Sequence, residues 1–160
     1  MSVAFTKEDS AETAAELMLP DRPISDAPNL VTPDGLEALQ RQRDAARTAY
    51  ELAMAIEDVN ERRRQAAGPL RDLRYYAERV RTAQLMAAPT GKDMVAFGTT
   101  VTFARDDGRT QTYTIVGEDE ADPKAGSISY VSPIAGALMG KSVGDLASAG
   151  ALEVEVVAIA

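Results

Sequence analysis

The side chains that could do chemistry in this chain are carboxylates, because the sequence contains neither cysteine nor histidine. This absence excludes the usual zinc sites, thiol chemistry, and Ser-His or Cys-His nucleophile pairs. Asp58 and Glu61 stand three residues apart, a common spacing that is also typical of a solvated helical turn. A second group crowds four carboxylates into five positions, at Glu118, Asp119, Glu120 and Asp122. Such a run cannot be buried unpaired, so it predicts an exposed loop.

Charge and hydropathy restrict the class of function. The formal net charge is −8 over 160 residues, which argues against binding free DNA or RNA, because phosphate neutralisation requires clustered Lys and Arg. No apolar run approaches the roughly 18 residues of a membrane span, and the N-terminus lacks the pattern of a signal peptide. We therefore expect a cytoplasmic protein without membrane contact. An acidic chain can still bind a nucleic-acid enzyme through basic surfaces on that enzyme.

A long helical region must position the first carboxylate pair. Thr32-Pro33 places an N-cap residue and a proline at the first helical position, which indicates a helix start. From Leu36 to Met86 the residues are mostly helix formers, and apolar residues recur every three or four positions in two seams. The seams are Leu36, Leu39, Ala46, Tyr50 and Ala53, then Ala66, Leu70, Leu73, Ala77 and Val80. Two such seams predict an antiparallel helical hairpin, or coiled coil.

Two positions could form the tip of this hairpin. Ala67-Gly68-Pro69 is the strongest local breaker, but a turn there would leave half of the first helix without a partner. A turn at Glu57–Glu61 gives nearly equal arms and keeps the second seam in phase across Gly68-Pro69. We favour the turn at Glu57–Glu61. This choice places Pro69 inside the second helix, where a proline destabilises the helix by about 3 kcal/mol.

The acidic run lies in a second region, which is patterned as β-strands. We expect strands at Val95–Phe103, Thr110–Gly117, Ser127–Val131 and Ala151–Ile159, and a short helix from Ser132-Pro133. In the last strand, Leu152, Val154 and Val156 alternate with Glu153 and Glu155, which is typical of an antiparallel sheet with one solvated face. The sequence thus predicts an α+β protein with an acidic arm (1–31), a hairpin (32–86), a linker (87–94) and a sheet domain (95–160).

Three motifs in the second region resemble the C-terminal domain of the bacterial GreA and GreB transcript-cleavage factors. They are IVGEDEAD (Ile115–Asp122), SYVSPIA (Ser129–Ala135) and GKSVGD (Gly140–Asp145), in the family's order and spacing. VAFGTTVTF (Val95–Phe103) matches the strand that opens that domain, and a weaker match extends back to Thr32. The resemblance implies an FKBP-like fold for residues 95–160. It also implies a monomeric accessory factor that docks on RNA polymerase at the secondary channel and meets nucleic acid only through that complex.

The same resemblance implies roles for both groups of carboxylates. The polymerase-docking surface would comprise Glu118, Asp119, Glu120, Asp122, Pro123, Ser132, Pro133 and Ile134. At the hairpin tip, Asp58 and Glu61 would help to hold a Mg²⁺ ion in the polymerase active site, where it activates water for transcript cleavage. Mg²⁺ accepts one or two protein carboxylates, so the pairing is chemically reasonable. The protein itself is expected to have no catalytic centre and no cofactor of its own.

The hairpin tip departs from the family pattern in ways that bear on function. Glu57 stands where the family has Gly, Arg62 stands where it has Asn, and Arg63 and Arg64 follow. Each arm is also about eight residues shorter than in familiar Gre factors, which shortens the reach by ~12 Å. We therefore predict a regulator that occupies the channel. The alternatives are a cleavage stimulator that uses Asp58 and Glu61, and a hairpin adaptor for another partner.

Overall fold

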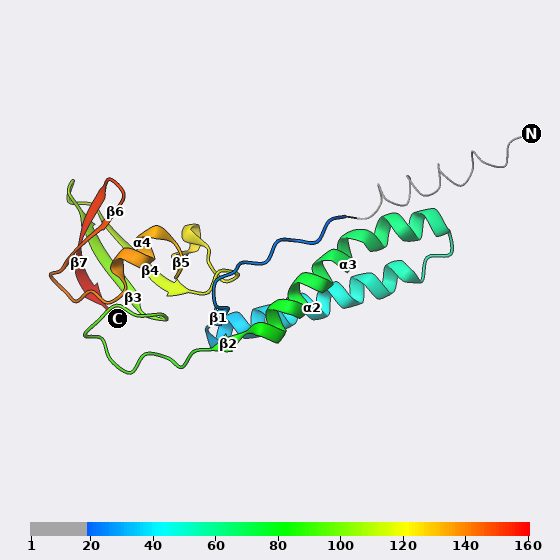
Figure 1. Cartoon of the computed structure of the whole chain (residues 1–160), viewed down its shortest axis with the longest axis horizontal. Helices are drawn as coiled ribbons and strands as arrows, with labels where there is room; N and C mark the ends of the chain where they lie inside the picture. Colours follow the sequence, from blue (N-terminus) through cyan, green and yellow to red (C-terminus); the bar gives the residue numbers. More distant parts are fainter. Residues whose placement is uncertain (1–18) are drawn as a thin grey trace, which may run out of the picture. The chain divides into compact units, whose positions relative to one another are not determined.

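The chain divides into two units in the computed structural model, which describes residues 19–160 (Figure 1). The hairpin unit contains Leu39–Arg81 together with residues 19–25, and the sheet unit contains Asp26–Ala38 and Thr82–Ala160. In this division, residues 26–31, which the sequence pattern places in the acidic arm, group with the sheet unit. The physical reason is that Leu30 and Val31 pair with Gln84 and Leu85, which lie in the sheet unit.

A short parallel ladder joins the two ends of the helical region. Strand β1 (Leu30–Val31) pairs with β2 (Gln84–Leu85). The amide of Gln84 donates to the carbonyl of Asn29 at 2.8 Å, and the amide of Met86 donates to the carbonyl of Val31 at 2.9 Å. This pairing ends the second helix at Thr82, four residues before the predicted end at Met86, because extended backbone cannot continue the helix.

Two long helices form the predicted antiparallel hairpin. Helix α2 spans Pro33–Met54, and helix α3 spans Val59–Thr82. Thr32 caps α2, since its Oγ1 accepts a hydrogen bond from the amide of Gly35 at 3.0 Å. The turn lies between Met54 and Val59, so the predicted tip beside Asp58 is confirmed. Helix α3 runs through Pro69 without a break in its assignment.

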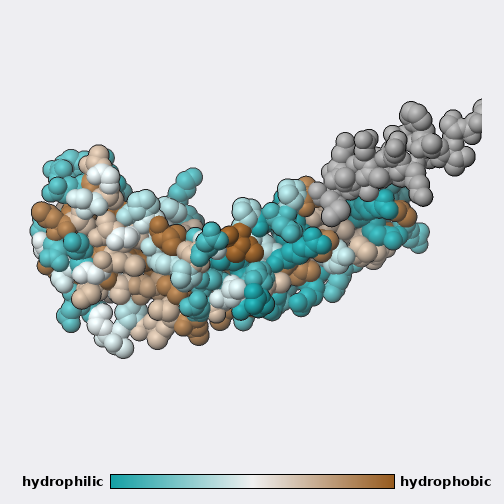
Figure 2. All heavy atoms as spheres, in the orientation of Figure 1, coloured by the Kyte–Doolittle hydropathy of each residue, from teal (hydrophilic) through white to brown (hydrophobic). Residues whose placement is uncertain are grey.

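Small side chains make up the buried seam between the helices. Leu39, Ala46 and Ala53 of α2 and Ala66 of α3 are buried, as the apolar spacing predicts. Ala77 is exposed, however, and Arg79 is buried in its place at 2% exposure. The long aliphatic stem of an arginine can cover apolar surface in this way. The visible faces of the hairpin are mostly polar, with separate apolar patches (Figure 2).

We expect Gly68→Ala to stabilise the hairpin by about 0.5–1 kcal/mol, because glycine in a helix interior is less favourable than alanine by that amount. A Cβ added at Gly68 would meet no atom within 4 Å. Urea unfolding followed by helical circular dichroism measures the gain. Gly108→Ala is the opposite control, since Gly108 has φ +80° and alanine there should destabilise by about 1–2 kcal/mol. A loss of stability in Gly68→Ala would contradict the helix interior assigned to this position.

The sheet unit contains a five-stranded mixed sheet in the order β5-β4-β3-β7-β6. Its strands are β3 (Thr100–Arg105), β4 (Thr110–Val116), β5 (Ser127–Ser129), β6 (Leu146–Ala149) and β7 (Leu152–Ile159). The prediction of an antiparallel sheet is wrong for one pair, because β4 and β5 run parallel. The 3-10 turn η1 (Pro123–Ala125) lies in the connection between these two strands.

One face of the sheet packs on the short helix α4 (Pro133–Leu138) to form the core. Phe103, Ile115, Leu138, Val154 and Val156 are among its most buried members, at 2% exposure or less. Val154 and Val156 therefore point inward as their alternation with Glu153 and Glu155 predicts. Together with the hairpin, this confirms the α+β fold class.

The first predicted strand begins later than expected. Residues 95–99 form a turn, in which the amide and Oγ1 of Thr99 both donate to the carbonyl of Ala96, at 3.0 and 2.7 Å. Gly98 takes φ +86°, which an extended strand cannot contain, so β3 starts at Thr100. Val95 and Thr99 are nevertheless buried, at 1% exposure each, because the turn folds over the core.

Candidate functional site

The carboxylate of Asp58 caps helix α3 at the hairpin tip. Its Oδ1 accepts a hydrogen bond from the amide of Glu61 at 2.7 Å, and its carbonyl accepts the next amide, that of Arg62, at 2.9 Å. These bonds satisfy amides that have no partner within the helix. The side chain that could reach a metal ion is therefore also the one that begins α3.

The carboxylate of Glu61 is held by two side chains of the same helix. Gln65 donates to its Oε1 at 2.9 Å, and Arg64 donates to its Oε2 at 2.6 Å. The hydrogen bond from Gln65, followed by the hydrogen bond and charge of Arg64, holds the pKa of Glu61 below its ordinary value. Glu61 therefore stays ionised to a lower pH than an ordinary glutamate, and both of its oxygens already have a partner.

The three consecutive arginines beside the tip have different roles. Arg62 donates to two carbonyls of the tip turn, from Nε to Ile56 at 2.7 Å and from Nη2 to Glu57 at 3.0 Å. Arg64 pairs with Glu61. Arg63 is exposed and has no ionic partner among residues 19–160. Arg62 thus contributes bonds that hold the turn, a role that the sequence alone did not indicate.

The acidic loop begins at a point where two chain segments touch. Gly117 lies so close to Leu30 that a Cβ on Gly117 would stand 2.3 Å from the Leu30 carbonyl oxygen. A Cβ on Gly35 would likewise stand 2.6 Å from Oε2 of Glu120. Both glycines therefore permit residues 30–35 to lie against the start of the loop, within the sheet unit.

Glu120 is engaged at the N-terminus of α2. Its Oε2 accepts a hydrogen bond of 2.6 Å from Oγ1 of Thr32, the same hydroxyl that caps the helix. A carboxylate at a helix N-terminus is also favoured by the helix dipole. Glu120 was predicted to bind a partner, but in this structure its carboxylate binds Thr32 of the same chain.

The remaining predicted docking residues of the loop differ in exposure. Glu118 is half-buried, whereas Asp119 and Asp122 are exposed. The main chain of Asp122 is fixed, since its amide lies 3.0 Å from Oγ of Ser127, while its carboxylate makes no capping bond at η1. Asp119 and Asp122 are thus the exposed residues among the four acids of this loop, and the main chain of Asp122 is held in place.

The predicted helix start lies beside this loop and borders a hollow. Ser132 caps α4 as predicted, since its Oγ accepts from the amide of Ala135 at 3.4 Å and donates to the carbonyl of Ser129 at 2.7 Å. Pro133 is exposed at the first helical position. Pro123, Ser132 and Ile134 are among the residues that line a hollow of about 350 Å³. The structure therefore brings three of the predicted docking residues, Pro123, Ser132 and Ile134, to one hollow of the sheet unit, and the polymerase-docking role of the set stays a prediction.

Residues 19–160 contain neither a cluster of metal-ligating side chains nor a membrane-spanning helix. No group of three or more carboxylate, histidine or cysteine side chains in this part of the chain could hold a metal ion. Within the same residues, no helix has the length and apolar character that crossing a bilayer requires.

Comparison with known proteins decides the family. The family model described as "Transcription elongation factor, GreA/GreB, C-term" matches residues 89–160. The transcription elongation factor GreA of Sphingopyxis alaskensis is 37% identical over 120 residues, which are 69% of this chain and 74% of that protein. The chain belongs to the GreA/GreB family.

Two further comparisons differ in how much of the chain they cover. The GreA of Desulfovibrio desulfuricans is 43% identical over 86 residues, and the match spans about half of that protein, 52% of its length. Among solved structures, the GreA factor homolog 1 of Thermus thermophilus matches with a TM-score of 0.40 and 23% identity, over 82% of this chain and 97% of that one. The match to the Sphingopyxis alaskensis GreA confirms the sequence prediction of a GreA/GreB-family protein.

Proposed function

We propose that this GreA/GreB-family protein binds RNA polymerase at the secondary channel and regulates elongation by occupying that channel with its hairpin. It would act as an accessory factor without a catalytic centre of its own. Family membership supports the polymerase as partner. The arrangement of the tip supports occupancy of the channel over stimulation of transcript cleavage.

The observation that carries this choice is the engagement of both tip carboxylates. Asp58 caps α3, and Glu61 is bonded to Gln65 and Arg64. To hold a Mg²⁺ ion, Glu61 would have to share oxygens that already bond to Gln65 and to the cationic Arg64, whereas Asp58 would have to bind the ion while its Oδ1 caps α3. The tip would supply at most two of the near-octahedral oxygen ligands of a Mg²⁺ ion, and the polymerase and water would have to supply the others.

The reach of the hairpin supports the same choice. Helix α2 has 22 residues and α3 has 24, so each extends for about 33–36 Å at 1.5 Å per residue. The arms are shorter than the family pattern by about eight residues, or ~12 Å. Metal ligation tolerates errors of only about 0.2 Å. Docking through the family's C-terminal surface would then leave Asp58 and Glu61 short of the metal.

Cleavage stimulation is the competing function, favoured by the presence of an Asp and a Glu at the tip. We expect saturating protein to leave RNA release from a stalled, backtracked polymerase within about twofold of the rate without factor. Polymerase binding, measured in parallel, should be intact. Asp58→Asn and Glu61→Gln are the informative variants, because asparagine is also a good N-cap residue and preserves the start of α3.

Rapid RNA release that is lost in either variant would establish the cleavage function and refute channel occupancy alone. The two amide variants separate chemistry from folding, since they remove the charges while keeping side-chain size. Absence of polymerase binding in the parallel assay would instead favour the adaptor alternative, in which the hairpin serves another partner.

A further inference from the structure

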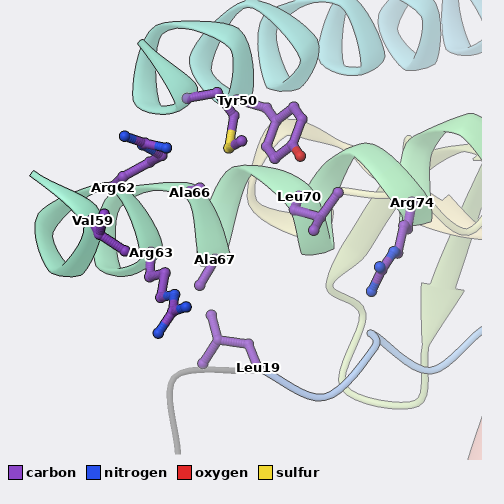
Figure 3. Close-up of a pocket in the computed structure, with 10 residues that line it drawn as sticks. Leu19, Tyr50, Val59, Arg62, Arg63, Ala66, Ala67, Leu70 and Arg74 are labelled. Carbon is purple, nitrogen blue, oxygen red and sulfur yellow. The ribbon is translucent and has the colours of Figure 1, made fainter. Parts of the chain in front are cut away.

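An apolar groove lies on one face of the hairpin close to its tip. The groove measures about 470 Å³ and is lined by Tyr50 and Met54 of α2 and by Val59, Ala66, Ala67 and Leu70 of α3. We call it the tip groove (Figure 3). Met54 and Val59 are 45% and 52% exposed, so residues 19–160 leave apolar side chains uncovered there.

The N-terminal arm runs toward this groove along α3. Arg22 bonds to Asp72 at 3.3 Å and lies over the ring of Tyr75, with 3.8 Å between its Cζ and the ring centroid. The side chain of Leu19, three residues earlier, already lines the tip groove. Figure 3 shows it on the side of α3 toward which Ala67 and Arg63 point. From Arg22 to Leu19 the arm therefore advances toward the tip, antiparallel to α3.

The sequence before Leu19 is long enough to cover the rest of the groove. Ala67 and Val59 are eight residues apart on α3, a separation of about 12 Å along the helix. An extended chain covers that distance in about four residues, whereas 18 residues precede Leu19. Part of this sequence is apolar at helical spacing, with Ala11, Ala14, Ala15 and Met18.

The charges of the same sequence complement those of the groove rim. Residues 1–18 contain Lys7 and four carboxylates, at Glu8, Asp9, Glu12 and Glu16. The rim carries Arg62, Arg63 and Arg74. Arg74 already bonds to an arm carboxylate, that of Asp21, at 3.4 Å. Arg63, the next arginine of the groove rim toward the tip, would meet a preceding carboxylate in the same way.

We infer that residues 1–18 of this chain bind in the tip groove, with their apolar side chains on Val59 and Met54 and their carboxylates facing Arg63. The proposed occupant is thus the chain's own N-terminal segment. The direction of the arm, the apolar lining of the groove and the complementary charges support this choice. This assignment does not depend on polymerase binding. In it, the groove and the tip arginines are covered surface, not a free docking site.

Disulfide trapping in the full-length chain tests this assignment, since the natural sequence has no cysteine. One cysteine replaces Ala11, Ala14 or Ala15, and a second replaces Val59 in the groove. Leu52 gives the matched control, because it is also exposed and apolar, at 69%, but lines a hollow on another part of the hairpin with Ala49, Ile56 and Gln65. A bridge requires Cα atoms within about 7 Å.

We expect at least one arm cysteine to form an intramolecular disulfide with Val59→Cys at least about tenfold faster than with Leu52→Cys. Adding Arg63→Glu should slow that reaction at least threefold, whereas Lys92→Glu, an equal charge change in the linker, should not. Circular dichroism confirms that each variant is folded. Equal rates at positions 59 and 52 would overturn the proposal, as would disulfides that form mainly between two molecules. An unchanged rate in Arg63→Glu would overturn the assigned charge contact.

Discussion

Gly117→Ala is expected to destabilise the sheet unit by about 3 kcal/mol, the upper part of the usual range for overpacking. The added Cβ would lie 2.3 Å from the carbonyl oxygen of Leu30. That oxygen belongs to backbone that cannot easily retreat, because Leu30 donates to Pro28 at 2.9 Å and the neighbouring residues are paired with β2. Chemical unfolding monitored by tyrosine signals measures the loss.

Two other glycines provide graded controls for this prediction. At Gly35 the added Cβ would meet the end of the Glu120 side chain at 2.6 Å, which can rotate away, so Gly35→Ala should cost about 1–2 kcal/mol for the hydrogen bond to Thr32. At Gly136, within α4, it would meet nothing within 4 Å, so Gly136→Ala should be neutral or slightly stabilising. A Gly117→Ala protein as stable as Gly136→Ala would show that residues 28–31 do not lie against this strand end in solution.

Reversing the charge of both exposed loop carboxylates, in Asp119→Lys/Asp122→Lys, is expected to weaken polymerase binding at least about tenfold. This result follows from the proposed docking surface, because rim charges steer association and set its salt dependence. Stability should change little, since substitutions at exposed loop positions usually stay within about 0.5 kcal/mol. Binding is measured by titration of polymerase at two salt concentrations.

The double variant Asp93→Lys/Asp106→Lys changes net charge by the same amount at two other exposed positions and should bind normally. Equal weakening in both double variants would indicate a general effect of charge and not a docking loop. Unchanged binding in Asp119→Lys/Asp122→Lys would remove the loop from the docking surface altogether. Glu120 is left out of the design, because its replacement would also break the bond to Thr32.

The sequence alone predicted the features that depend on near neighbours. The tip beside Asp58 follows from two arms of nearly equal length. The caps at Thr32 and Ser132 follow from local spacing, because each hydroxyl oxygen accepts a hydrogen bond from the amide three residues later. Strand β7 follows from the alternation of apolar and charged residues. For the caps and the strand the deciding interactions lie within a few positions of one another, and for the tip the lengths of the two arms suffice, so composition and spacing are enough.

Tertiary structure alone decided which predicted site residues are available. Glu120 and Asp122 are indistinguishable acids in one loop by sequence, yet Glu120 bonds to Thr32, which lies 88 positions away, and Asp122 faces solvent. The pairing of β1 with β2, the parallel direction of β5 and the contact of Gly117 with Leu30 were likewise not predicted. Such contacts join segments that have no periodic relation in the sequence, so only the folded chain shows them.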